Sequence, residues 1–97
     1  MARFDLHPDG DNFLLDVQSD FLDHLNTRFV VPIRLPEQAP LPARRLNPIF
    51  QIGKQRYVMV TQFASAVMAS ALEPPIGELS HEQDRITAAL DMLFQGF

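Results

Sequence analysis

The distribution of proline is the strongest constraint on the fold of this chain. Five of its eight prolines fall between Pro32 and Pro48. Proline lacks a backbone N–H and disfavours helical backbone at the residue before it, so a helix cannot run through this region. We therefore expect an extended loop in the middle of the chain.

Before this loop, the sequence predicts a hairpin and a strand. Short apolar-rich runs at 3–6 and 13–17 flank 7–12, where Pro, Gly, Asp and Asn are typical of a turn. The β-branched residues in 28–33 predict a strand. Because Pro32 cannot donate to a ladder, we expect that strand at a sheet edge or a bulge.

After the loop, a second hairpin is expected. Two apolar-rich runs, 49–52 and 55–61, flank Gly53-Lys54, and glycine suits the first position of a type II′ turn. The second run is nearly all apolar in its middle, so both faces of that strand should be covered. Residues 63–72 are ambiguous, because their alanines favour a helix while their length and position favour a strand.

The last segment predicts one clear helix. Ser80 and Gln83 have the spacing of a capping box, in which each side chain bonds the backbone of the other. An apolar stripe at helical spacing follows: Ile86, Ala89, Leu90 and Leu93. Gly96 is expected to end the helix in the left-handed conformation. The predicted fold is therefore mainly β, a small antiparallel sheet or barrel with one C-terminal helix.

Length and composition limit the classes of function. The 97 residues are expected to form a single domain, 1–97. The net charge of −4 disfavours contact with a phosphate backbone, and the basic residues are scattered, with Arg44-Arg45 the only adjacent pair. The chain has no cysteine, no signal-peptide pattern and no membrane-length apolar run, so we expect a cytoplasmic location. An apolar share of 46% beside 21% charged residues favours an interface with another protein.

No motif predicts catalysis or a bound cofactor. The three histidines stand far apart in the sequence: His7, His24 and His81. Asp20 and His24 lack a third ligand at a sensible spacing, so solvated loop positions are expected instead of a metal site. Asp16, Asp20 and Asp23 form a carboxylate cluster, but nothing marks an apolar cleft that would separate their pKa values. A glycine-rich phosphate loop and a nucleophile elbow are both missing.

Two stretches remain as candidate contact surfaces. Phe21 and Leu22 lie among acidic residues and are either core anchors or exposed contacts, and the residues alone favour the core. At the end of the chain, Phe94 and Phe97 either pack back against the helix or form an apolar end offered to a partner.

The segment 16–23, Asp-Val-Gln-Ser-Asp-Phe-Leu-Asp, resembles the D-V-Q-S-D segment of the CcdB family of toxins. The resemblance covers nearly the whole chain and is weakest in the first hairpin and in the proline-rich loop. Further short matches follow in the same order: 28–33, 48–53, 59–61, 64–65, 79–81 and 94–97.

The resemblance implies the SH3-like antiparallel barrel of the CcdB/MazF group with a C-terminal helix, in which residues 63–72 are mainly turn and strand. It implies a homodimer that is not an enzyme and has no cofactor. Such a toxin binds the A subunit of DNA gyrase, traps it on cleaved DNA and is removed by a partly disordered, CcdA-like antitoxin. Direct contact with nucleic acid or a membrane is not expected.

The resemblance also implies a gyrase-facing surface. Its residues are Ser19, Phe21, Leu22, Gln83, Asp91, Gln95, Gly96 and Phe97. The family's tail is typically Trp-Gly-Ile, so Gln95 replaces a Trp that stacks on gyrase arginines, and Phe97 replaces Ile. Asp91 stands where the family's best-known member has Asn. Two alternatives stay open: a MazF-like endoribonuclease on the same barrel, and a non-toxic relative that only binds antitoxin.

Overall fold

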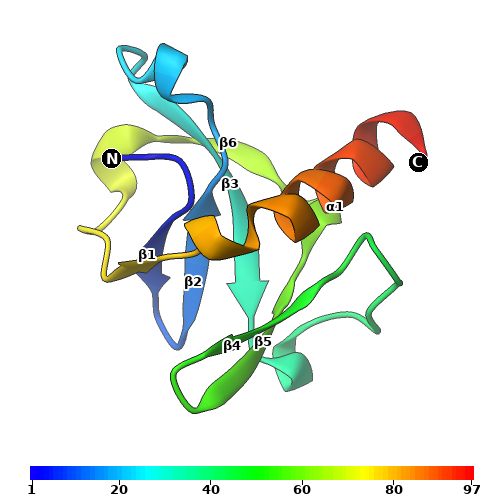
Figure 1. Cartoon of the computed structure of the whole chain (residues 1–97). Coiled ribbons are helices and arrows are strands. Elements are labelled where there is room, and N and C mark those ends of the chain that lie inside the picture. The colour runs from blue at the N-terminus through cyan, green and yellow to red at the C-terminus, as the bar shows by residue number, and fades with distance from the viewer.

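The computed structural model describes residues 1–97 as a curled antiparallel sheet, a half-barrel, with one C-terminal helix against it (Figure 1). This confirms the predicted mainly β fold. The strands are β1 (Asp5–Asp9), β2 (Asn12–Asp16), β3 (Thr27–Arg34), β4 (Ile49–Ile52), β5 (Gln55–Met59), β6 (Ser65–Met68) and β7 (Gly77–Glu78). The helix α1 is Gln83–Gln95, and the short 3₁₀ turns are η1 (Asp20–Leu22), η2 (Pro36–Gln38), η3 (Thr61–Phe63), η4 (Ala69–Ala71) and η5 (Ser80–Glu82). The strands follow the order β4-β5-β3-β2-β1-β7, and β6 pairs with β3.

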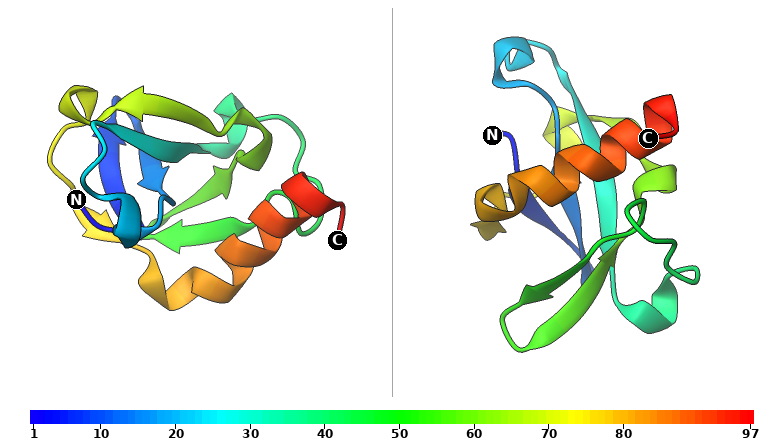
Figure 2. Two further views of the ribbon diagram at one scale, coloured as in Figure 1. Left: turned by 90° about the horizontal axis from the view of Figure 1, so that it is seen from above. Right: turned by 45° about the vertical axis from the view of Figure 1, so that its right-hand side comes forward.

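The hydrophobic core lies between the sheet and α1, which runs across one face of the half-barrel (Figures 1 and 2). Alternate strand residues face this core, among them Leu15 in β2 and Val31 and Ile33 in β3, because strand side chains alternate between the two faces. The helix contributes Ile86, Ala89 and Leu90. No helix combines the length and the apolar character that crossing a membrane requires.

The first hairpin is confirmed, but its turn is shorter than predicted. Strand β1 continues through His7 and Pro8, and only Gly10-Asp11 connects it to β2, with Gly10 at a φ of +62°. Pro8 is tolerated because β7 pairs with β1 only at Asp5 and Leu6, so the proline falls where the outer edge of β1 has no neighbouring strand. The prediction that 7–12 is all turn is therefore wrong.

His7, which lies in the segment predicted as turn, belongs to β1. Its side chain is fully buried, and its Nδ1 lies 2.7 Å from the carbonyl oxygen of Glu73. The imidazole thus ties β1 to the segment that precedes β7. No local pattern predicts this contact, because the two residues are 66 positions apart.

Pro32 lies in the centre of the sheet, where the sequence predicted an edge or a bulge. Strand β3 pairs with β2 along one side, while on the other side it pairs first with β6 and then with β5. The Pro32 carbonyl accepts from the Val60 N–H at 2.8 Å, so the missing N–H faces the gap between β5 and β6. There the Val60 carbonyl accepts instead from Phe63 in η3, at 2.9 Å. A short turn thus replaces the bond that proline cannot make.

The second hairpin is confirmed with its predicted turn. Gly53 has a φ of +63° and Lys54 does not have a positive φ, as a type II′ turn requires. Val58 and Met59 are buried, as predicted for a strand covered on both faces. The proline-rich segment before this hairpin is loop apart from η2. Residues 63–72 are turn and strand (η3, β6 and η4), as the resemblance implied.

The start of the C-terminal helix differs from the prediction. The chain enters α1 through η5, and neither Leu79 nor Glu82 caps a helix end with its side chain. Ser80 is inside η5, where its N–H donates to the Glu78 carboxylate at 2.8 Å, so the predicted capping box is not formed. At the other end, Gly96 stops the helix at a φ of +81°, as predicted.

The apolar stripe of α1 ends one turn earlier than predicted. Leu93 is 36% exposed, although Ile86, Ala89 and Leu90 before it are buried. The reason is visible in Figure 1, where the last turns of α1 extend past the sheet and have no strand beneath them.

Candidate functional site

The segment Asp16–Phe21 begins in the core and ends in a projecting loop. Asp16 is fully buried and pairs with the buried Arg28, with 2.7 Å between Oδ2 and Nε. It therefore does not belong to a carboxylate cluster with Asp20 and Asp23, which are exposed. Strand pairing between β2 and β3 brings its arginine partner from twelve positions away.

Gln18 is the hydrogen-bonding centre of this loop. Its side-chain amide donates to the carbonyl oxygens of Leu22 (3.0 Å) and Thr27 (3.1 Å). Its side-chain oxygen accepts from the Phe29 N–H at 3.0 Å. One side chain thus connects the outgoing strand, the 3₁₀ turn and the returning strand. Sequence reasoning missed this role, although Gln18 lies within the segment that carried the resemblance.

Ser19 and Asp20 hold the turn itself. The Ser19 hydroxyl accepts from the Phe21 N–H at 3.2 Å, which caps η1. The Asp20 carboxylate accepts from the Arg3 N–H at 2.9 Å and so ties the turn to the N-terminal segment. The loop that carries Phe21 is therefore bound to the body of the protein from two sides.

The side chains at the loop's outer end face solvent. Phe21 is 93% exposed, and Leu22 and Leu25 are more than two-fifths exposed. The prediction that Phe21 and Leu22 anchor the core is wrong, because the loop rises beyond the sheet and no strand or helix covers it (Figure 1). The exposure that the resemblance implied for these two residues is observed.

The chain end forms a second exposed apolar surface, which we call the tail (Leu93, Phe94 and Phe97). Phe94 is 66% and Phe97 71% exposed, so neither packs back onto the helix. Gln95 and Gly96 between them are exposed as well, and Asp91 is half-buried.

The eight predicted contact residues do not form one patch on the chain. Gln83 begins α1 and Gln95 ends it, about 18 Å apart along a helix that rises ~1.5 Å per residue. The loop that bears Ser19, Phe21 and Leu22 lies away from the C-terminus in every view (Figures 1 and 2). The candidate site thus consists of two surfaces, the 19–26 loop and the C-terminal part of α1 with the tail.

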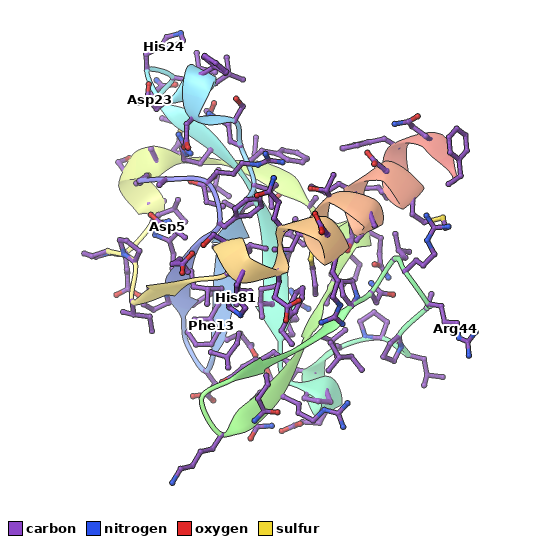
Figure 3. The ribbon with its side chains drawn as sticks, in the orientation of Figure 1. Asp5, Phe13, Asp23, His24, Arg44 and His81 are labelled. Carbon is purple, nitrogen blue, oxygen red and sulfur yellow. The ribbon has the colours of Figure 1, made fainter.

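The titratable groups near these surfaces are spread out. Figure 3 places Asp23 and His24 at the outer end of the loop and His81 beside the start of α1. No three histidine, aspartate or glutamate side chains come close enough to hold a metal ion. The pKa of the exposed Glu78 carboxylate is lowered below its ordinary value of 4.5. The main cause is a hydrogen bond from the Ser80 hydroxyl, and a hydrogen bond from the Ser80 backbone N–H adds to it. This interaction orders the turn before α1, outside both surfaces.

One comparison with known proteins bears on these surfaces. A protein-family model described as "CcdB protein" matches residues 4–96. The match includes the loop, the helix and all of the tail except its final phenylalanine.

Proposed function

The chain belongs to the CcdB family of toxin–antitoxin toxins, and from this premise we propose that it binds the A subunit of DNA gyrase and traps the enzyme on cleaved DNA. On this proposal the protein acts by binding and is not an enzyme. Its site of action is the cytoplasm, where gyrase and DNA are found.

The 93% exposure of Phe21 on a braced loop is the observation that best supports the proposal. A large aromatic side chain that is exposed to water lowers the solubility of a protein. The same side chain can contribute much of the binding energy when a partner's pocket buries it. The bonds of Gln18 and Ser19 hold the loop in place, so binding would lose little conformational entropy.

The tail supplies the second proposed contact, in an altered form. Gln95 stands where the family typically has Trp, and cation–π stacking of that ring on an arginine is worth about 2 kcal/mol when desolvated. Phe97, 71% exposed, retains an apolar group at the chain end. We therefore expect Gln95→Trp to raise toxicity, and an unchanged or lower toxicity would contradict the use of this surface.

A homodimer is part of the proposal. Strand β6 pairs with β3 on one edge only, and two apolar residues at its ends, Phe63 in the preceding η3 and Met68 in β6, are about half exposed. When two copies of a protein associate, their interface often covers free strand edges and exposed apolar side chains. A monomer at micromolar concentration in light scattering would contradict this arrangement. A CcdA-like antitoxin that folds on binding would be the natural antagonist.

The test is a supercoiling and DNA-cleavage assay with gyrase from the same host. We expect cleaved DNA to accumulate, and Phe21→Ala to raise the concentration needed by about ten-fold or more. Leu41→Ala is the matched control, because Leu41 is also 93% exposed but lies in the proline-rich loop. Deletion of the last three residues should abolish the effect.

A result without cleaved DNA would reject the proposal and lead to the alternatives. RNA cleavage by the pure protein would then establish a MazF-like endoribonuclease. Binding of antitoxin without any toxicity would establish a non-toxic relative, for which Gln95 in place of Trp is the supporting observation.

A further inference from the structure

Four arginines line a groove between the proline-rich loop, β5 and α1. Two adjoining hollows of about 410 and 250 Å³ share Arg45, Pro48 and Arg85. The larger one also includes Arg44 and Arg56. We call this the arginine groove, and it holds four of the chain's eight basic residues. These residues are scattered in the sequence, and folding brings three separate segments together.

The loop that carries Arg44 and Arg45 is held in place. Asn47, which is buried, donates to the Met59 carbonyl (3.0 Å) and to the Gln62 side-chain oxygen (2.7 Å). Its own side-chain oxygen accepts from the Ala43 N–H at 3.0 Å, and its N–H donates to the Ala43 carbonyl at 2.9 Å. The turn is thus closed on itself and fastened to the end of β5.

Two of the arginines are positioned by specific features. Arg45 has a φ of +65°, in the left-handed region where glycine is favoured and a long side chain is uncommon. Arg85 donates to the Ile49 carbonyl at 2.9 Å and lies over the Phe50 ring at 4.9 Å. Its guanidinium also contacts Glu82 at 3.3 Å, on the helix surface. Arg44, at the rim, projects outward (Figure 3).

We propose that the arginine groove binds an extended acidic peptide segment of a partner protein. No Asp or Glu lines either hollow, and Arg44, Arg45 and Arg56 have no ion-pair partner within the chain. Guanidinium groups match carboxylates in a two-pronged geometry. Two hollows in series suit an elongated chain with several carboxylates.

The remaining lining favours a peptide over a nucleic acid. Neither hollow is lined by an aromatic side chain, the platform on which nucleobases most often stack in proteins that bind single strands. The whole chain has a net charge of −4 although the groove holds four of its eight basic residues, so the surface outside the groove is acidic and would repel a long polyanion. Pro42, Pro48 and Ala88 offer small apolar contacts to a peptide. This inference goes beyond gyrase binding and does not depend on it.

The test uses the intact protein and a rhodamine-labelled peptide of alternating glutamate and alanine, with fluorescence anisotropy as the readout. Arg45→Gly should weaken binding about five- to ten-fold, because it removes a central guanidinium. Glycine accepts the positive φ, so the unfolding midpoint should not fall. Lys54→Ala, which removes one exposed charge from the β4–β5 turn, is the matched control and should change binding less than about two-fold.

Several results would overturn the proposal. Equal losses in Arg45→Gly and Lys54→Ala would mean that only net charge matters. Equal binding of a glutamine–alanine peptide would exclude carboxylate recognition. Tighter, Arg45-dependent binding of a short RNA would make the groove a nucleic-acid site. Self-association in sedimentation that Arg45→Gly abolishes would show that a second copy of this chain occupies the groove.

Discussion

The buried ion pair between Asp16 and Arg28 allows the sharpest prediction about stability. The side chains are 0% and 2% exposed, and Nε and Oδ2 are 2.7 Å apart. We consider Arg28→Met, which replaces the charged side chain with an unbranched apolar one and leaves the Asp16 carboxylate without a counter-ion in the core. Replacing one member of a buried pair in this way costs about 3–5 kcal/mol.

This loss is large for a chain of 97 residues. Small domains unfold with a free energy of about 5–15 kcal/mol, and each kcal/mol shifts their Tm by roughly 4–8 °C. We therefore expect Arg28→Met to lower Tm by roughly 12–40 °C.

A double-mutant cycle separates the pair from its surroundings. Asp16→Asn keeps the Oδ1 atom that accepts from the Gln18 N–H at 3.0 Å, removes the charge and replaces the Oδ2 acceptor that faces Arg28 with an NH₂ group. The double variant no longer buries an unpaired charge, so its loss should be smaller than the sum of the two single losses by about 2–3 kcal/mol. The free energy of unfolding of all four proteins is measured by urea denaturation, with circular dichroism as the readout.

Arg56→Met is the control, since Arg56 is exposed and has no ion-pair partner, and it should change stability by less than about 0.5 kcal/mol. A loss below about 1 kcal/mol in Arg28→Met, or strict additivity in the cycle, would refute the reasoning that this buried pair stabilises the fold.

Two further predictions concern local hydrogen bonds. Gln18→Ala removes three bonds worth about 1 kcal/mol each, so urea unfolding should show a loss of about 2–3 kcal/mol, and gyrase poisoning through Phe21 should weaken as the loop loosens. Gln55→Ala, at the exposed first residue of β5, should leave both measurements unchanged. Ser80→Ala should raise the pKa of Glu78 toward 4.5, as followed by NMR titration of the carboxyl carbon. Because the folded-state pKa is lowered, this contribution to stability is present above pH 4.5 and disappears as pH falls through the folded value, so the two proteins should differ at neutral pH and converge in acid.

Local backbone chemistry accounts for what could be predicted of the fold. The second hairpin, a strand over 28–33, the proline-rich loop and the glycine that ends the helix were all predicted from neighbouring residues, although that strand was expected at an edge or a bulge and lies inside the sheet. Each depends on which φ values and hydrogen bonds a residue can supply, as with Gly53 and Gly96. For residues 63–72 local propensity was ambiguous, and the family resemblance decided correctly for turn and strand.

The candidate site was only partly visible in the sequence. Ser19, Phe21 and Leu22 were identified through the resemblance, whereas the apolar character of Phe21 and Leu22 pointed to the core. The hydrophobicity of a side chain indicates that burial is favourable, but it does not indicate whether the protein's own core or the surface of a partner buries it. Gln18 was overlooked because its role lies in contacts with Leu22, Thr27 and Phe29, which the loop brings together.

The sequence by itself determined most of the local elements and their order, because turn geometry and side-chain period act over a few residues. Tertiary structure decided the rest. Pro32 lies inside the sheet because β3 changes its pairing from β6 to β5 beside it. Asp16 contacts Arg28 because β2 and β3 pair. The arginine groove required three distant segments to converge. These outcomes depend on long-range register, which no local pattern specifies, since contacts between distant residues form only when the whole sheet closes around its core.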